Sequence, residues 1–531
     1  MPEIKLLARD SAAVCHALER GEILHLDTAS EEITDEFLLF AIESGLLQRW
    51  AETFPDPRKW SEIKMQVLLA ATIAARFAAL YSLRATGYVL RSAGVLGALG
   101  YSVEVLEEGD GLSGRGTSDD SLFSSDVMRK LLVKMEQEVE VNTTIEAASC
   151  TASEQAPSVK VRTRERASRR QVKQGVEKSD WQARAVAATL QMMAWYNREV
   201  GPSLLEYVHG VGTRRVHILD TTRIEVELES GNYELSGVVK DDDGSRHRGY
   251  KLGTLRTLLD TAGVLTQVVV GAIHVHDLKL CRELVKESPV LCAGDVLIED
   301  RAFLDGELIS YLKQERGVDV IHPLRSNMMA YTEAVAIAEL EHRFEEHPSR
   351  EAQQIALVEG VDQWWDECQV KLNACVIRYR AKKTEEFQYL VLVSTDEELS
   401  ARWIVKHYEA RPEIEQDYQQ LKSGGWQLQK LSSTRYTEIV WHLLSVVLSY
   451  NLYQLFTNTK SGSRFANQTR KAIVVEQLKT HRTHVIVYAG GYFEIFETLK
   501  FVHKVLQLSP EVQKRLKTWL DEHLPIVTQL E

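Results

Sequence analysis

Two short segments constrain the fold of this chain more than any other feature, because each is an apolar, β-branched run that leads into an aspartate. VHILDTTRIEV carries Asp220, and GDVLIEDRAF carries Asp300. Runs of this composition are typical of strands that are buried on both faces of a sheet. The sequence therefore predicts a sheet in which two buried strands each end at a carboxylate.

A third acidic residue stands in the segment YEARPEIEQDYQQLK. Its polar residues have the spacing Y-x2-R-x3-E-x6-K and are Tyr408, Arg411, Glu415 and Lys422. Pro412 suits the first position of a helix, because its missing N–H would be unpaired there in any case. We therefore predict a helix from Pro412 that carries Glu415 and Lys422 two turns apart on one face, with Tyr408 and Arg411 on the connector before it. Taken alone, the segment also fits a solvated amphipathic helix.

Two strand-borne aspartates and one helix-borne glutamate form a set that can hold two divalent cations. In-line cleavage of a phosphodiester needs a deprotonated attacking hydroxyl and a stabilised leaving oxygen, and two cations about 4 Å apart supply both. Magnesium prefers carboxylate oxygens and keeps several waters, so three acids and a substrate phosphate suffice as ligands.

These motifs together resemble the DDE transposases of bacterial insertion sequences, specifically the group with a Tyr-Arg-Glu-Lys signature, the insertion-sequence-four type. The resemblance rests on LDTT at Asp220, EDRAF at Asp300 and the four residues of the signature. Weaker similarity lies in GYKLGTL, from Gly249, and in the His276-Asp277 pair. The resemblance as a whole covers about residues 210 to 460. Pro412 departs from the pattern, since many relatives have an aromatic residue there.

The resemblance implies a cut-and-paste transposase that cleaves transposon ends and joins them to target DNA. Asp220 would bridge two Mg2+ ions, Asp300 would bind one and Glu415 the other, with Mn2+ as a substitute. Tyr408, Arg411 and Lys422 would contact DNA phosphates near the scissile bond; the alternative for Tyr408 is a packing aromatic. The implied partners are double-stranded DNA, as terminal inverted repeats and target, and a second copy of the chain in a homodimer.

The order of predicted elements indicates the fold class. A helix from Trp181 to Val208 precedes a strand that ends at Asp220. TRIEVEL, ELSGVVK and TQVVVGAIHV then read as three further β runs, followed by a helix, the strand before Asp300 and another helix. This order predicts an α/β fold with an RNase H-like mixed-sheet catalytic core, interrupted by an α+β insertion and flanked by helical N-terminal and C-terminal regions. The insertion follows from the roughly 115 residues between Asp300 and Glu415, which exceed any loop.

Six segments are expected along the chain. They are a helical N-terminal domain that would bind DNA ends (1–105), a linker and helix with a basic connector (106–177), the first part of the catalytic core (178–328), the insertion (329–405), the completion of the core with the Glu415 helix (406–460) and a basic, helical C-terminal region (461–531).

The net charge of −13 argues against nucleic-acid binding, but the charge is unevenly distributed. Residues 422–482 hold nine basic and two acidic side chains. A second basic stretch, at 160–173, includes the arginines of a DNA-binding connector, Arg162, Arg164, Arg166, Arg169 and Arg170. Such runs are either solvated faces or phosphate contacts, and their place on both sides of the acidic residues favours the second interpretation.

The sequence predicts a cytoplasmic protein, associated with the nucleoid when bound to DNA. Six cysteines are scattered without a C-x-x-C pair, as expected for reduced core thiols. The N-terminus lacks the pattern of a secretory signal. The most apolar run, 440–456, contains His442, Asn451 and Gln454 and is barely long enough to span a bilayer, so we interpret it as a buried helix.

Three further features keep two interpretations each. LRATGYVLRSAGVLGALGY (83–101) fits a helix-turn-helix or part of a small helical bundle. His274, His276 and Asp277 form H-x-H-D, which could bind a metal, although on a strand Asp277 would face away from the histidines. The tryptophans of the insertion fit either wedges that stack on a displaced base during hairpin formation or core residues, and they are Trp364, Trp365 and Trp403.

Two other functions fit the same residues. A captured relative would bind DNA without catalysis, and a nuclease would cut without joining. The presence of Asp220, Asp300 and Glu415 together favours an active enzyme over the first of these.

Overall fold

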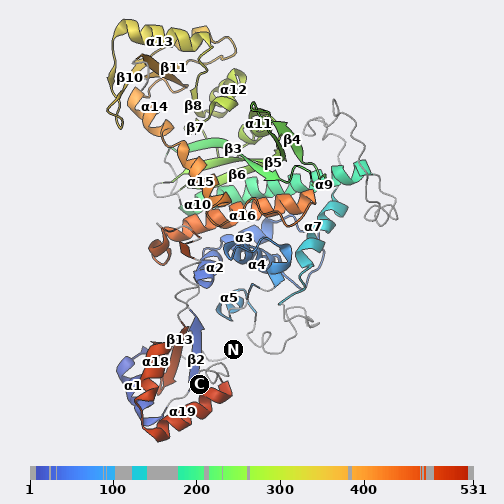
Figure 1. Cartoon of the computed structure of the whole chain (residues 1–531), viewed down its shortest axis with the longest axis vertical. Helices are drawn as coiled ribbons and strands as arrows, with labels where there is room; N and C mark the ends of the chain where they lie inside the picture. The colour runs from blue at the N-terminus through green and yellow to red at the C-terminus, as the bar shows by residue number, and fades with distance from the viewer. Residues whose placement is uncertain are drawn as a thin grey trace. The chain divides into compact units, whose positions relative to one another are not determined.

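The computed structural model describes most of the chain (Figure 1). The described residues are 8–22, 25–30, 33–87, 89–90, 93–101, 122–139, 178–208, 214–229, 231–259, 263–380, 386–466, 468, 470, 472–473 and 483–523. The contacts divide the chain into two compact units, Met1–Glu36 with Lys471–Glu531, and Phe37–Arg470. This grouping differs from the six segments expected from the sequence. The predicted DNA-binding connector, Arg162, Arg164, Arg166, Arg169 and Arg170, lies outside the described residues and stays a prediction.

A mixed sheet of ten strands organises the larger unit. Its order is β4-β5-β3-β7-β8-β12-β11-β10-β9, with β6 paired to β5. The strands of the core are β3 (Val216–Val226), β4 (Gly237–Lys240), β5 (Arg246–Leu258), β6 (Gly263–Ala272), β7 (Val296–Ile298) and β8 (Asp319–Pro323). The remaining strands are β9 (Glu345–Glu346), β10 (Gln353–Val358), β11 (Asn373–Arg380) and β12 (Phe387–Ser394).

The strands β6-β5-β3-β7-β8 and two helices form the RNase H-like core. β5 runs antiparallel to β3 and β6, whereas β7 and β8 run parallel to β3. Helix α11 (Asp277–Lys286) connects β6 to β7, and α12 (Gly306–Arg316) connects β7 to β8. This mixed α/β arrangement confirms the predicted fold class.

Two strand predictions were wrong in detail. TRIEVEL is not a separate strand, because β3 continues through Asp220 to Val226 without a break. Its antiparallel partner β5, 13 residues long, was not predicted as a strand. Both errors have one cause: the polar residues at the centre of the β3–β5 pair interrupt the apolar pattern, yet they pair in register, with Asp220 opposite Thr254.

The predicted insertion forms part of the same sheet. β12 pairs antiparallel with β8, and β11, β10 and β9 follow outward from it. Helix α13 (Met329–Glu341) and the 3-10 turn η5 (Val361–Trp364) pack beside these strands, and α14 (Ala401–Tyr408) returns the chain toward the core. Figure 1 shows this region as the yellow and orange lobe that continues the green strands.

Helices cover both faces of the core sheet. α11 lies on the face that carries Gly253, where an added Cβ would meet Cys281 Sγ at 2.5 Å, so only glycine allows this approach. The opposite face, which carries Thr254, meets α15 (Pro412–Lys422) through Tyr418. Helix α16 (Tyr436–Thr457) packs on β6 and beside α9 (Lys178–Trp195). The core sheet is thus held between two helical layers.

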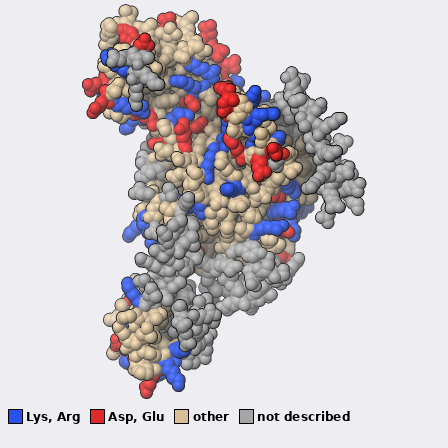
Figure 2. All heavy atoms as spheres, viewed as in Figure 1, with Lys and Arg blue, Asp and Glu red and all other residues tan. Residues whose placement is uncertain are grey.

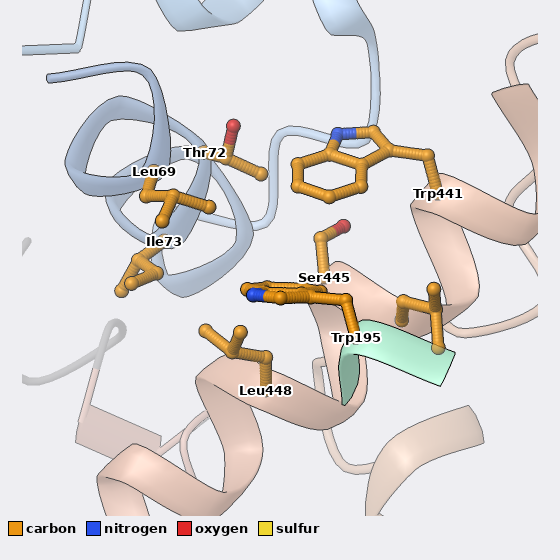
Figure 3. A pocket seen from close by; sticks show the side chains of 8 residues that line it. Leu69, Thr72, Ile73, Trp195, Trp441, Ser445 and Leu448 are labelled. Atoms are coloured by element: carbon orange, nitrogen blue, oxygen red, sulfur yellow. The ribbon is translucent and has the colours of Figure 1, made fainter. Parts of the chain in front are cut away.

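α16 is long and apolar enough to cross a membrane by length and composition, but 94% of its apolar window is buried inside the protein. The predicted buried helix is therefore confirmed. The helices around it are α2 (Ile33–Glu43), α3 (Leu46–Thr53), α4 (Met65–Phe77), α7 (Val127–Glu138), the π-helical turn η3 (Tyr196–Val200) and α10 (Gly201–Val208). Figure 3 shows a small cavity between α4, α9 and α16, with Trp195 and Trp441 on its lining. Its lining is almost wholly apolar, which makes it a packing gap of the core.

Of the two interpretations of residues 83–101, a helix-turn-helix and part of a small helical bundle, the structure favours the second. The first helical run of this segment is a 3-10 turn, η1 (Leu83–Gly87), and its second is the six-residue α5 (Ala93–Ala98). A helix-turn-helix needs two α-helices, so the described residues of this segment fit a small helical bundle better.

The smaller unit combines both ends of the chain. Its sheet has the order β1-β14-β13-β2. The elements of this unit are β1 (Ala8–Arg9), α1 (Ser11–Arg20), β2 (His25–Ser30), β13 (Thr483–Ala489), β14 (Tyr492–Glu497), α18 (Thr498–Leu506) and α19 (Pro510–His523). Its core joins Val14 and Leu18 of α1 to Val487, Phe501 and Leu516 from the C-terminal part.

Candidate active site

The two aspartates come from neighbouring parallel strands at the same level. Ile218 of β3 is in register with Ile298 of β7, so Asp220 and Asp300 each stand two residues beyond that pair. In each, Oδ1 accepts a hydrogen bond from the backbone N–H of the next residue, at 2.8 Å for Asp220 and 2.6 Å for Asp300. Both side chains therefore have one oxygen fixed and the other, Oδ2, free for a shared partner.

Glu415 reaches the same place from α15. The helix begins at Pro412, as predicted, with Arg411 at its N-cap. Glu415 lies in the first turn, where the helix dipole favours a carboxylate. Its side chain is 56% exposed, against 35% for Asp300 and 14% for Asp220. The three acids thus run from the buried strand to the open surface.

Arg411 joins the three acids. Its Nη1 lies 2.8 Å from Oε1 of Glu415, and its Nη2 lies 3.0 Å from Oδ2 of Asp300 and 3.7 Å from Oδ2 of Asp220. Burial would lower the pKa of Arg411, but the surrounding carboxylates, Asp300 first, raise it, so the guanidinium stays charged. Its Nε is buried without a hydrogen-bond partner. Three carboxylates therefore converge on one cation that is itself incompletely paired.

Asp220 is the acid whose ionisation the site controls most. Burial raises its pKa to about 6, and the negative charges of Asp300 and Glu415 add to this effect, whereas the Thr221 N–H and Arg411 oppose it. Above that pH the cluster carries three carboxylates against one guanidinium. A surplus of negative charge in a partly buried site is suited to a divalent cation.

These residues fit a metal by their donor chemistry, although not in their present arrangement. Among the described residues, no group of three or more His, Cys, Asp or Glu side chains is gathered closely enough to hold a metal ion. The guanidinium of Arg411 stands between the three carboxylates instead. Asp220, Asp300 and Glu415 would hold a metal once Arg411 withdraws, and their assignment as metal ligands stays a prediction.

The other residues of the signature lie in two different places. Tyr408 ends α14, rather than lying on a connector, and burial raises the pKa of its hydroxyl, on which the charges of Arg411 and Asp300 also act. Lys422 ends α15, away from the acids. Burial lowers its pKa, and the charge that opposes this effect is Glu225, near the far end of β3. Tyr408 and Arg411 are therefore at the acids, and Lys422 is two turns along the helix.

Sequence reasoning missed the contacts that hold α15 in place. The Tyr418 hydroxyl donates to the backbone oxygen of Asp220 at 2.8 Å. Asp417 accepts from Arg256 Nε at 2.6 Å and from the Tyr450 hydroxyl at 2.6 Å. The spacing of apolar residues along α15 indicates that Tyr418 is buried, but no local pattern indicates its partner.

A second missed network lies on the other face of β3. The Thr221 hydroxyl donates to Asp277 Oδ1 at 2.5 Å, and Lys251 Nζ lies 2.9 Å from the same oxygen. The prediction that His274, His276 and Asp277 share a strand was wrong, because β6 ends at Ala272. His276 instead caps α11, accepting from the Leu278 N–H, and Asp277 begins that helix.

The three tryptophans occupy different settings. Trp365 is buried, which fits the core-packing interpretation. Trp364 ends η5 and is half-buried. Trp403 of α14 stacks on His407, with ring centroids 3.5 Å apart, and lies 5.2 Å from the Arg214 guanidinium. Its ring is therefore already engaged within the protein, and the wedge role stays a prediction.

Charges on the visible surface are mixed. Figure 2 shows basic and acidic side chains interspersed over the insertion and the core sheet. On this face the described residues therefore form no uniformly basic surface.

The comparisons with known proteins agree with this geometry. The family described as Transposase DDE domain matches residues 212–452, which is 241 of the 531 residues. No curated protein matches the chain. The matched segment contains Asp220, Asp300 and Glu415, the core strands β3 to β8 and most of α16. Through residues 212–452 the chain is therefore similar to the transposase DDE domain family.

Proposed function

We propose that this protein is a cut-and-paste DNA transposase of the Tyr-Arg-Glu-Lys, insertion-sequence-four type. It cleaves transposon ends and transfers them into target DNA in a reaction that depends on Mg2+. The observation that carries the proposal is the convergence of Asp220, Asp300 and Glu415 on the Arg411 guanidinium. Residues from two parallel strands and a helix, 195 positions apart at the extremes, have no structural need to meet around one cation.

In this proposal the acidic residues bind metal and the other residues of the signature contact DNA phosphates. Asp220, Asp300 and Glu415 would hold two divalent cations, with Mn2+ as a substitute, which supply an activated hydroxyl and stabilise the leaving oxygen when bound. Arg411, once released from the acids, can form two parallel hydrogen bonds to a phosphate. The Tyr408 hydroxyl can donate to a phosphate oxygen, and Lys422, two turns along α15, suits a phosphate further along the same DNA.

The protein acts in this proposal on double-stranded DNA as a homodimer, in the cytoplasm and bound to the nucleoid. Holding the two transposon ends together for cleavage requires two active sites, which is the reason for the dimer. Synapsis of this kind also explains why local cationic groups suffice in an acidic chain, since each copy contributes its own Arg411 and Lys422.

Duplex DNA from the regions flanking the gene, incubated with the full chain and Mg2+, tests the proposal. Asp220→Asn, Asp300→Asn and Glu415→Gln remove one charge each and keep the shape. We expect cleavage to fall by several orders of magnitude in each variant, while retardation of end DNA in a gel persists. Asp242→Asn, an exposed carboxylate in the turn after β4, is the matched control and should cleave as the wild type does.

The product pattern separates the competing functions. Nicked, hairpin and joined products support the transposase, whereas cut ends without joined products indicate a nuclease. Retardation without any cleavage indicates a captured DNA-binding relative. Undiminished Mg2+-dependent cleavage in one of the three acid variants removes that residue from the catalytic set.

A further inference from the structure

A hydrogen bond that involves no carboxylate connects the helix of Glu415 to the strand of Asp220. Tyr418 lies one turn after Glu415 on α15 and is 5% exposed. Its hydroxyl lies 2.8 Å from the backbone oxygen of Asp220 and 2.7 Å from Oγ1 of Thr254. A carbonyl can only accept and the phenol has a single hydrogen, so Tyr418 donates to Asp220 and accepts from Thr254. The directions of both hydrogen bonds of the Tyr418 hydroxyl are therefore fixed.

The backbone of Asp220 needs support at this point. The pairing of β3 with its parallel neighbour β7 ends at Ile218 and Ile298, two residues before Asp220. Beyond that level β5 is the one strand that pairs with β3 among the described residues. Tyr418 holds the carbonyl of Asp220, while the Thr221 N–H holds its Oδ1. The peptide unit that follows Asp220 is thus held at both its carbonyl oxygen and its N–H.

Asp417, the residue before Tyr418, also holds α15 in place, but through other partners. Asp417 pairs with Arg256 of β5 and with Tyr450 of α16, which fastens the helix to the sheet and to the layer beneath it. None of these partners is one of the three acids. Tyr418 is the residue of α15 with a described hydrogen bond to Asp220, and this bond fixes the rotation of the helix relative to that residue.

We propose that Tyr418 is a positioning residue of the active site, which holds Glu415 in register with Asp220 by donating a hydrogen bond to the Asp220 carbonyl. Its effect passes through the two acids, since its hydroxyl faces the backbone and not the substrate side. The proposal rests on the proposed function in one respect, namely that these acids bind divalent cations.

Tyr196 offers a matched control for the loss of a buried phenol. Its hydroxyl donates to the backbone oxygen of Leu265 in β6 at 2.7 Å and accepts from Asn451 at 2.7 Å. It is fully buried, and like Tyr418 it donates to a backbone oxygen of the core sheet and accepts one side-chain hydrogen bond, here from Asn451 of α16. No described hydrogen bond links Tyr196 to Asp220, Asp300 or Glu415.

Binding of Mn2+ to the full chain, followed by the electron paramagnetic resonance signal of free Mn2+, tests the proposal without any need for catalysis. Tyr418→Phe should bind Mn2+ on the order of tenfold more weakly, because the support of a metal ligand is lost. Tyr196→Phe should bind it as the wild type does. The two variants should have similar thermal unfolding midpoints, since each loses one buried phenol hydrogen bond.

Wild-type Mn2+ affinity in Tyr418→Phe overturns the proposal, and so does an equal loss of affinity in both phenylalanine variants. If Tyr418→Phe does not fold, Thr254→Val decides: it leaves the bond from the Tyr418 hydroxyl to the Asp220 carbonyl in place, so near-wild-type Mn2+ binding supports the proposal, and a loss on the order of tenfold is contrary to it. Asp220→Asn distinguishes failure of the proposed metal site from failure of the positioning role. If Mn2+ binding survives that change, the proposed metal site itself is wrong; if it is lost while Tyr418→Phe binds normally, only the positioning role fails.

Discussion

At the scale of single residues, the contacts that Arg411 makes with the three acids exclude the phosphate contact that we propose for it. In the protein without DNA its guanidinium neutralises part of the charge of Asp220, Asp300 and Glu415. The same group cannot contact a phosphate or leave room for a metal while it does so. Metal binding and release of Arg411 should therefore be coupled, and the released arginine would then face the DNA.

Arg411→Ala should have opposite effects on metal binding and on cleavage. Without DNA, removal of the competing cation should strengthen Mn2+ binding several-fold, because the carboxylates then face the metal alone. Cleavage of end DNA should nevertheless fall, since a phosphate contact is lost. Titration of free Mn2+ and a cleavage assay measure the two effects, with the exposed Arg343→Ala as control. Weaker Mn2+ binding in Arg411→Ala would show that the guanidinium organises the acids instead of competing for them.

Asp220 should give the metal-free protein a characteristic dependence on pH. Its pKa is about 6 in the folded protein, raised by burial from 3.8. The folded state therefore holds a proton that the unfolded chain releases between about pH 4 and pH 6, and this residue lowers stability as the pH rises through that window. Asp220→Asn removes the penalty.

In EDTA, Asp220→Asn should unfold at a higher temperature than the wild type above pH 7, and the difference should vanish below about pH 4. The comparison of the two proteins cancels the contributions of all other titrating groups. A difference in melting temperature that does not change with pH would contradict the raised pKa.

At the scale of elements, α15 shows what the sequence predicts and what it does not. The start of the helix at Pro412 and the place of Glu415 follow from local rules and are found in the structure. The hydrogen bond from Tyr418 to Asp220 joins residues 198 positions apart, and neither residue type predicts the other as its partner. Local patterns predict which face of a helix is buried, but a partner that far away is set by the topology of the sheet.

The same limit explains the misread strands. β3 and β5 were harder to recognise because Asp220, Thr221 and Thr254 place polar groups in the middle of buried strands. Those groups are satisfied by Tyr418, Asp277 and one another, contacts that arise only after folding. The insertion helix α13 and the strands β11 and β12 have regular patterns, and they give the insertion the α+β composition that the sequence predicted.

The buried ion pair beneath α15 should contribute strongly to stability. Asp417 and Arg256 lie 2.6 Å apart and are nearly inaccessible. Asp417→Ala leaves Arg256 buried with only the exposed Glu413 as an ionic partner, which should cost about 3 kcal/mol in the free energy of unfolding. Urea denaturation measures the cost. The double variant Asp417→Leu with Arg256→Met should lose less than the single variant, because no charge is left unpaired; a larger loss would be evidence against this account.

At the scale of the whole molecule, the two compact units should unfold independently of each other. Val487 lies at the centre of the smaller unit and is fully buried, so Val487→Asp should unfold that unit. The three acids belong to the larger unit, and Mn2+ binding should stay at the wild-type level. Limited proteolysis followed by mass measurement would locate the unfolding. Leu506→Asp, the same kind of change at a side chain that is 67% exposed, is the control. Loss of Mn2+ binding in Val487→Asp would show that the units depend on each other.

The smaller unit also imposes an order of events on the ribosome. More than 460 residues separate the end of α1 at Arg20 from the start of β13 at Thr483. At bacterial or eukaryotic elongation rates of about 5 to 20 residues per second, the first helix waits roughly 20 to 90 seconds for the strands that will cover it. The segment Phe37–Arg470, which contains the larger unit in one uninterrupted stretch, has emerged by then. The nascent protein should therefore acquire its acidic site before its two ends meet, and a prematurely terminated chain would carry the site without the unit that the ends build together.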